Sequence, residues 1–357
     1  MVMDRRGRRD EGSGTLALAA AGVGLFLLGR SMVRQHRWMD FEGKTALITG
    51  GSRGLGLLLG REFVTHGANV VICARDGDDL ERARVDLERQ GGRVLSIPCD
   101  VSDRAQVDRL VREAAARFGA VDVLVNNAGT ISVGPMEVMT LEDYEEAMRI
   151  HFWGPLYTTL AVLPAMRDRR QGRIVNISSI GGKVPAPHLL PYTASKFALT
   201  GFSEGLRAEL KKDNVYVTTV CPGLMRTGSP PNANFKGKHQ EEYAWFTISD
   251  SLPLTAMSAK RAARRIVLAC QRGESEVILS VQAKLAAKFH GVFPGASAEL
   301  NSLINDYLLP GPGGIGTGTA KGHQSESAVT RSFLTALTRR AARENNEEAR
   351  TQKVEPL

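Results

Sequence analysis

From Lys44 onward the sequence alternates short apolar runs, rich in β-branched residues, with longer amphipathic stretches. The runs are KTALIT, NVVICA, RVLSIP, VDVLV, RIVNIS, VYVTTV and EVIL, which begin at Lys44, Asn69, Arg93, Val121, Arg173, Val215 and Glu276. Between them, segments such as DDLERARVDLERQ carry apolar residues at three- and four-residue spacing, as sheet-covering helices do. This alternation is typical of βαβ units with parallel strands. We therefore expect an α/β fold in a single domain, with one doubly wound, parallel, seven-stranded sheet.

The chain divides into three expected parts. Residues 1–39 form a basic leader in which residues 12–29 carry no charge and predict an apolar helix. Arginines flank this run on both sides, and at about 1.5 Å per residue it falls slightly short of the ~30 Å of a bilayer core. We expect a membrane anchor here; the alternatives are a packed or flexible leader and a cleaved secretory signal. Residues 40–309 form the folded domain.

Composition changes at residue 310. Residues 310–357 begin with PGPGGIGTGTAKGHQSES, which lacks the apolar residues of a core, and end in a charged stretch. We expect a disordered tail, with a short helix over about 332–348 as the structured alternative. The net charge of +8 is spread along helical stretches, so we expect no nucleic-acid partner. The four cysteines are far apart, which predicts reduced thiols and no metal site.

The first predicted strand runs directly into a glycine-rich turn, Thr49-Gly50-Gly51-Ser52-Arg53-Gly54-Leu55-Gly56, and then into a helix. In a Rossmann-type fold, Gly50 would allow the tight turn, Gly54 the approach of a pyrophosphate, and Gly56 close helix packing. The second strand ends at Arg75, where an NAD-selective protein usually has a carboxylate. Arg75 and Arg53 suit a ribose 2′-phosphate, which favours NADP(H) as the cofactor, with NAD(H) as the alternative.

Tyr192 and Lys196 are four residues apart at the start of a predicted helix and therefore share one face. An ammonium beside a phenol lowers the phenol's pKa and makes it a useful acid or base. We expect Tyr192 to donate a proton, Lys196 to lower its pKa, and Ser179 to polarise a substrate carbonyl. Ser178 competes with Ser179 for this role.

The order and spacing of TGGSRGLG, Asn126-Asn127-Ala128-Gly129, Ser179 and Tyr192-Thr193-Ala194-Ser195-Lys196 resemble the classical short-chain dehydrogenase/reductase family over residues 40–309. The resemblance implies an NAD(P)-dependent oxidoreductase that interconverts a carbonyl and a secondary alcohol. With the turn and Arg75, the implied cofactor-binding residues are Gly50, Ser52, Arg53, Gly54, Leu55, Gly56, Arg75, Asp100, Val101, Asn127, Ala128, Gly129, Tyr192, Lys196, Pro222, Gly223 and Thr227.

One position departs from the family pattern. Where the family commonly has an asparagine that holds a relay water, this chain has His151. Imidazole both donates and accepts hydrogen bonds, so a proton relay from Lys196 through water is the functional interpretation. The other is a packed structural histidine in a protein without turnover. This second reading supports an alternative function, a non-catalytic NADP(H)-binding sensor.

Residues 228–253 correspond to the family's variable substrate-covering segment. They contain Phe235, Tyr243, Trp245, Phe246 and Leu252, which predict an apolar pocket. Together with the predicted anchor at residues 12–29, they favour NADPH-dependent reduction of a lipophilic ketone. We expect membrane association with the catalytic domain facing the cytoplasm, or else a cytoplasmic protein, and a homo-oligomer. A membrane-tethered interaction protein is the remaining alternative.

Overall fold

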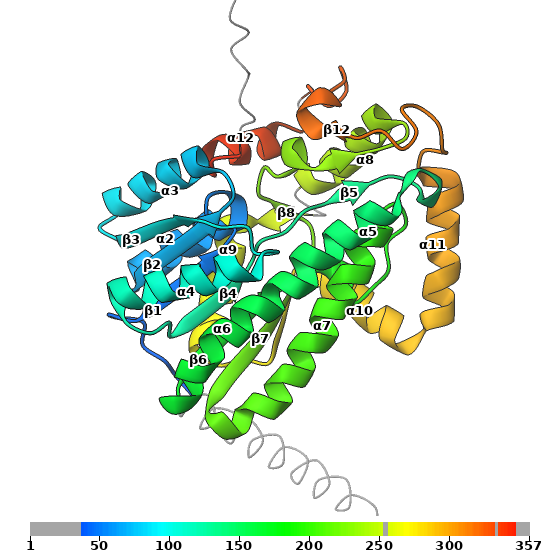
Figure 1. The fold of residues 1–357 in the computed structure, drawn as a ribbon. Coiled ribbons are helices and arrows are strands. Elements are labelled where there is room, and N and C mark those ends of the chain that lie inside the picture. The colour runs from blue at the N-terminus through cyan, green and yellow to red at the C-terminus, as the bar shows by residue number, and fades with distance from the viewer. Residues whose placement is uncertain (1–36, 253–255, 333–334, 348–357) are drawn as a thin grey trace, which may run out of the picture.

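The structure, a computed structural model, describes residues 37–252, 256–332 and 335–347. A seven-stranded parallel sheet forms the centre of the described protein (Figure 1). Its strands are β1 (Thr45–Thr49), β2 (Asn69–Ala74), β3 (Arg93–Pro98), β4 (Val123–Asn126), β6 (Gly172–Ile177), β7 (Val215–Pro222) and β11 (Glu276–Leu279). Each coincides with one of the predicted apolar runs, so the expected α/β fold in a single domain is confirmed.

Helices cover both faces of the sheet (Figure 1). The larger helices are α2 (Gly54–Thr65), α3 (Gly77–Arg89), α4 (Arg104–Phe118), α5 (Leu141–Met148), α6 (Gly154–Asp168), α7 (Leu190–Leu210), α8 (His239–Ser251), α9 (Ala259–Gln271), α10 (Val281–Val292), α11 (Pro294–Leu308) and α12 (Ala336–Glu344). Alternate residues of β1 enter different cores: Ile48 packs with α2, α3 and α9, and Leu47 packs with α4 and α6. This period-two alternation explains why the strand is apolar throughout.

The strand order is β11-β7-β6-β4-β1-β2-β3. The chain builds outward from β1 in one direction through β2 and β3, and then crosses back to β4 on the other side of β1. Connections leaving the carboxyl ends of β1 and β4 therefore diverge, and ligands of doubly wound sheets bind in the crevice that this divergence creates. The glycine-rich turn follows β1 and the Asn127 segment follows β4, which places both at that crevice.

The described part of the tail is ordered, in contrast to the expected disorder. Strand β12 (Ala320–Lys321) pairs antiparallel with β9 (Asn234–Phe235), which itself pairs with β5 (Ser132–Val133). Helix α12 then packs near α8 (Figure 1). The glycine-rich sequence does not need a core of its own, because its backbone forms hydrogen bonds with the main domain and its small side chains lie on the surface of that domain.

Among the described residues, no helix combines the length and apolarity needed to cross a bilayer. The apolar helix predicted within residues 12–29 lies outside the described residues.

Candidate active site

One large cavity, of about 970 Å³, opens at the carboxyl ends of the strands. It brings together most of the residues selected from the sequence. The predicted residues that line it are Gly50, Ser52, Arg53, Leu55, Arg75, Asp100, Val101, Asn127, Ala128, Gly129, His151, Ser179, Tyr192, Lys196, Pro222, Gly223 and Thr227. Gly54 and Gly56 shape the turn behind this lining.

The glycine-rich turn is held by the segment after β4. Gly50 and Gly54 have φ values of +63° and +55°, which glycine adopts without the strain that a side chain would cause. Asn127 Nδ2 donates to the carbonyl oxygens of Thr49 (3.0 Å) and Gly50 (3.1 Å). Thr49 Oγ1 accepts hydrogen bonds from the Asn127 and Ala128 amides. The two loops therefore form one fixed wall of the cavity.

Two acidic residues near this wall have local hydrogen bonds of their own. Asp76 caps α3 by accepting from the Asp79 amide at 2.9 Å. Asp100 Oδ1 accepts from the amide and hydroxyl of Ser102, at 2.9 and 2.8 Å, while Asp100 also lines the cavity. Asp100 therefore combines a turn-forming role with a position at the site.

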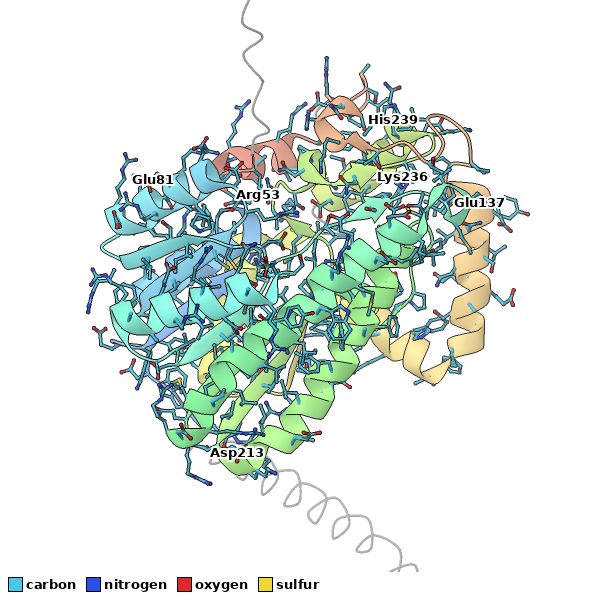
Figure 2. The ribbon with its side chains drawn as sticks, in the orientation of Figure 1. Arg53, Glu81, Glu137, Asp213, Lys236 and His239 are labelled. Carbon is cyan, nitrogen blue, oxygen red and sulfur yellow. The ribbon has the colours of Figure 1, made fainter. Side chains whose placement is uncertain are left out.

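Cations gather at the outer end of the cavity. Arg53 lies beneath α12 (Figure 2) and Arg75 is exposed at the cavity wall. A third cation, Lys321 on β12, comes from the part of the chain predicted to be disordered. Burial lowers the pKa of Lys321; the charge of Glu146 raises it in part, and the charges of Arg53 and Arg75 lower it. Three cations therefore lie at this end of the cavity, an arrangement that attracts anions.

Ser179, Tyr192 and Lys196 meet at the inner end. Helix α7 carries Tyr192 and Lys196 one turn apart, and Lys196 Nζ lies 5.6 Å from the centre of the Tyr192 ring. Ser179 follows β6 and hydrogen-bonds to the Tyr192 side chain. Ser178 is instead directed toward α7, where its hydroxyl contacts Thr200 Oγ1 (2.7 Å) and the Lys196 carbonyl (3.1 Å). The geometry favours Ser179 over Ser178 beside the phenol.

The protonation pattern differs from the one expected from the sequence. Burial raises the pKa of Tyr192, although the hydrogen bond from Ser179 lowers it in part. Burial also lowers the pKa of Lys196 to about 7, and its ammonium donates to the Ile177 carbonyl oxygen at 2.9 Å. Burial is the largest influence on both groups, and it places the Tyr192 pKa above its usual value rather than below it. Tyr192 therefore keeps its proton at neutral pH.

The buried Lys196 predicts a pH-dependent gain in stability for Lys196→Met. Its folded-state pKa of about 7 lies below the unfolded value of 10.5, so the unfolded chain binds more protons between these values. Stability should therefore rise with pH across this window, and the variant should lose that dependence. We expect Lys196→Met to gain about 2 kcal/mol more over wild type at pH 6 than at pH 9, measured by urea unfolding without ligand. An equal effect at both pH values would contradict a depressed Lys196 pKa.

His151 is buried in a π-helical turn, η2 (Arg149–Trp153), between α5 and α6. Its Nε2 accepts from the Thr130 amide at 3.1 Å, so the ring proton is on Nδ1, which lies 2.8 Å from Ser195 Oγ. Ser195 in turn donates to the Tyr192 carbonyl oxygen at 2.9 Å. Burial, followed by the charge of Lys196, lowers the His151 pKa well below its usual value. His151 is thus a neutral imidazole that connects the cavity wall to the helix that carries Tyr192.

The apolar part of the cavity differs from the one predicted. Of the five residues selected in 228–253, Trp245 and Phe246 line the cavity. Phe235 and Tyr243 are buried in a small core with Phe246, and Leu252 is 38% exposed. Further apolar lining comes from α10, from α11 and from the residue after it, namely Ala286, Ile304, Leu308 and Leu309. Sequence reasoning missed these because their spacing is that of ordinary amphipathic helices.

Glu347 is a further residue that sequence reasoning missed, and it also lines the cavity. Its side chain is buried, and its carboxylate forms an ion pair with Arg53, with Oε2 3.7 Å from Nε. Burial raises the pKa of Glu347 to about 7, against the effect of Arg53. No local motif marks this residue, which lies 294 positions after Arg53 in the chain.

Comparisons with known proteins agree with the geometry. The short chain dehydrogenase family profile matches residues 44–236. A dehydrogenase/reductase SDR family protein 7-like from Anopheles gambiae is 38% identical over 280 residues, which are 76% of this chain and 86% of that protein. The 3-ketodihydrosphingosine reductase of Mus musculus is 38% identical over 215 residues, 58% of this chain and 65% of that enzyme.

Solved structures show the same fold. An L-sorbose reductase from Gluconobacter frateurii, complexed with NADPH and L-sorbose, has a TM-score of 0.61 and 30% identity, and the match covers 68% of this chain and 97% of that one. A short-chain dehydrogenase from Streptomyces avermitilis has a TM-score of 0.62 and 31% identity, with 73% and 97% covered. The fold and the sequence matches agree that the chain belongs to the short-chain dehydrogenase family, whose classical members are NAD(P)(H)-binding oxidoreductases acting on CH–OH groups.

Proposed function

We propose that this chain reduces a lipophilic ketone to a secondary alcohol and prefers NADPH as the hydride donor. The observation that carries the proposal is the combination of groups that line this cavity. Its outer end has three cations, its inner end has the Ser179–Tyr192–Lys196 cluster, and its remaining wall has apolar residues from α8, α10 and α11. A dinucleotide and an extended apolar substrate could therefore meet at one proton donor.

The glycine-rich turn fits the cofactor. A β-carbon on Gly50 would lie 2.8 Å from the Ala128 α-carbon, so only glycine leaves this wall open. When bound, NADPH would supply the hydride that the ketone carbon accepts. In this proposal Ser179 and Tyr192 hydrogen-bond to the carbonyl oxygen, and the Tyr192 hydroxyl transfers its proton to that oxygen as the alcohol forms. The Lys196 ammonium, when charged, stabilises the phenolate left on Tyr192.

His151 has a positioning role in this proposal. Its two ring nitrogens are engaged by Thr130 and Ser195, rather than by Lys196. Its ring also meets the Tyr192 ring edge-on, with centroids 5.4 Å apart. These contacts orient the start of α7 and thereby the phenol, which is a different task from the proton relay suggested by the sequence. A neutral histidine in this position also removes a reason to favour a non-catalytic sensor.

Cofactor preference is tested by reversing one charge at the outer end. We expect Arg75→Glu to raise the Kd for NADPH about 10-fold or more and to change the Kd for NADH by less than about 3-fold, because only NADPH has a 2′-phosphate. Nucleotide fluorescence titration measures both values. Arg89→Glu is the matched control, since Arg89 is exposed on α3 outside the cavity lining. Equal weakening of both cofactors by Arg75→Glu would count against the preference.

The proposal of a lipophilic substrate is supported by the apolar lining of the cavity and by the names of two relatives. One is named a 3-ketodihydrosphingosine reductase, and another, from Acinetobacter baylyi, a fatty acyl-CoA reductase. The test is NADPH oxidation by the full chain with long-chain keto lipids, steroid ketones and, as a polar comparison, L-sorbose. Turnover should favour the lipids in kcat/KM. Preference for L-sorbose would overturn the substrate class, and cofactor binding without any turnover would favour the sensor.

We further propose that the chain associates with a membrane through residues 12–29 and that its catalytic domain lies on the cytoplasmic side. We also propose that it forms a homo-oligomer. A lipid substrate is most concentrated in a bilayer, and an anchor would keep the cavity near it. Full-length chain should therefore co-sediment with vesicles more strongly than chain lacking residues 1–36. Equal sedimentation would place the membrane contact elsewhere or remove it.

A further inference from the structure

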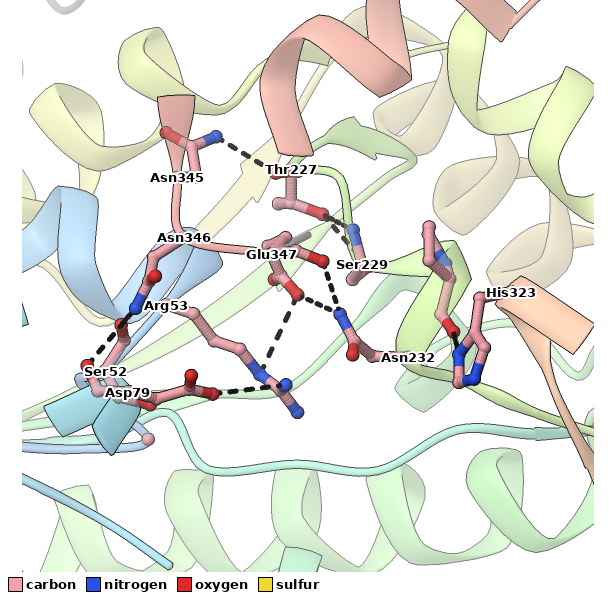
Figure 3. Close-up of polar contacts among 12 residues, drawn as sticks. Ser52, Arg53, Asp79, Thr227, Ser229, Asn232, His323, Asn345, Asn346 and Glu347 are labelled. Atoms are coloured by element: carbon pink, nitrogen blue, oxygen red, sulfur yellow. Dashed lines mark hydrogen bonds and ion pairs between the residues drawn. The ribbon is translucent and has the colours of Figure 1, made fainter. Parts of the chain in front are cut away.

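Three consecutive residues near the end of the chain, Asn345–Glu347, lie across the glycine-rich turn (Figure 3). We call them the C-terminal strap. The Asn345 carbonyl oxygen accepts from the Gly54 amide at 2.8 Å, and Asn346 Nδ2 donates to the Ser52 carbonyl oxygen at 2.9 Å. The strap thus forms hydrogen bonds with backbone groups of the glycine-rich turn, and the sequence predicts that this turn binds the cofactor.

The strap also contacts the opposite wall of the cavity. Asn345 Nδ2 donates to the Thr227 carbonyl oxygen at 3.0 Å. Asn232 Nδ2 donates to the Glu347 carboxylate at 2.8 Å and to the Glu347 carbonyl oxygen at 2.9 Å. The segment therefore bridges the two walls between which a dinucleotide would lie.

The Glu347 carboxylate takes the place of an anion at this turn. A β-carbon built on Gly54 would collide with Glu347 Oε1, so the carboxylate fills the space that this glycine leaves open at the start of α2. Helix N-termini attract phosphates and carboxylates alike. Arg53, the expected partner of a cofactor phosphate, is shared between Glu347 and Asp79, each at 3.7 Å.

We propose that the C-terminal strap is an internal competitor of the cofactor phosphates, and that it must leave the cavity before NADP(H) binds. The inference rests on the proposed function, since it takes the cavity to be the cofactor site. Glu347 imitates a phosphate in charge and position, and the Asn345 carbonyl oxygen uses the Gly54 amide. The strap and the cofactor are mutually exclusive ligands of one turn.

The charge of Glu347 is only partly compensated in the strap. Burial raises the pKa of Glu347 to about 7, which shows that the charged carboxylate is poorly compensated despite Arg53 and Asn232. A phosphate carries more charge and more acceptor oxygens, and so it is the better partner for the same groups. If the strap occupies the site nine-tenths of the time, it weakens apparent cofactor affinity about 10-fold.

Two truncations of the full chain separate the strap from the residues that follow it. Ending the chain after Glu344 removes the strap, and ending it after Glu347 keeps the strap and serves as the matched control. We expect the shorter chain to bind NADPH about 10-fold more tightly, measured by nucleotide fluorescence without substrate. Equal or weaker binding by the shorter chain would overturn the inference. If neither chain binds NADPH or NADH, the cofactor assignment fails and the inference fails with it.

Point variants test the carboxylate without shortening the chain. Glu347→Gln keeps the shape and removes the charge, and it should tighten NADPH binding more than NADH binding because Arg53 is released. Glu344→Gln is the control, since that exposed carboxylate pairs with Arg340 and Lys260 outside the cavity. An identical effect of the two variants on NADPH affinity would contradict a specific role for Glu347.

Hydrogen exchange of the unaltered chain gives an independent readout. Adding NADPH should increase amide exchange over residues 336–347, because the strap is displaced as the nucleotide enters. A decrease in exchange there would mean that the segment closes over the cofactor, which would contradict the inference that the C-terminal strap competes with it.

Discussion

Tyr192→Phe is expected to lower kcat/KM for NADPH-dependent ketone reduction by about 100- to 10,000-fold, the usual effect of removing a positioned proton donor. The substitution removes the hydroxyl and its hydrogen bond with Ser179, while the ring that meets His151 remains. Because burial keeps Tyr192 protonated, the wild-type hydroxyl is available as an acid across the neutral range. Steady-state NADPH oxidation measures the loss.

Two controls isolate the proton transfer. NADPH titration of Tyr192→Phe should give a Kd close to that of wild type, since the change adds no volume to the cavity. Tyr157→Phe removes a hydroxyl from a tyrosine that stacks on Trp153 outside the cavity lining, and it should leave turnover unchanged. If Tyr192→Phe kept more than about a tenth of the activity, the proton would have to come from another group, and Ser179 would be the first to test.

Local sequence patterns were sufficient to predict the strands of the sheet and the residues at the centre of the site. Each strand had its own apolar run, and Gly50, Ser179 and Tyr192 occupy the ends of strands or the start of a helix, where short sequence context determines placement. The carboxyl ends of parallel strands then bring such residues together without further information. This is why motifs far apart in sequence could be assigned to one cavity.

The tail could not be predicted because its contacts are with distant parts of the chain. Lys321 depends on pairing with Asn234 of β9, and Glu347 depends on Arg53 and Asn232. Glycine-rich and charged sequences carry no apolar pattern that would reveal such contacts. Composition therefore indicated disorder where the folded domain supplies the partners.

The pKa of Tyr192 shows, for a single side chain, the same limit of prediction from sequence. Spacing on a helix showed that Lys196 is near, and proximity alone predicts a lowered phenol pKa. The sign of the shift depends on how much water each group loses, which is set by the whole surrounding wall. Burial of both side chains reverses the expected direction for Tyr192 and draws the pKa of Lys196 down to about 7.

Gly56→Ala is expected to damage both folding and cofactor binding. A β-carbon at this position would overlap the Gly50 carbonyl oxygen and lie 2.6 Å from Asn127 Nδ2, the atom that joins the two loops. The obstacle is backbone, which cannot move as a flexible side chain can, so α2 must shift away from the turn. Overpacking of this kind costs about 1–3 kcal/mol, which urea unfolding would measure.

The same displacement of α2 by Gly56→Ala should weaken cofactor binding, and this effect can be measured separately from the loss of stability. Moving α2 changes the position of its N-terminal amides relative to the cavity, and we expect the Kd for NADPH to rise about 10-fold or more at temperatures where the variant stays folded. Gly77→Ala is the matched control, because a β-carbon there meets nothing within 4 Å at the start of α3. It should change stability by less than about 0.5 kcal/mol and leave the Kd unaltered. Indistinguishable behaviour of the two variants would mean that α2 does not need to approach the turn so closely, and the phosphate cradle would then have to be formed by the Asn127 wall alone.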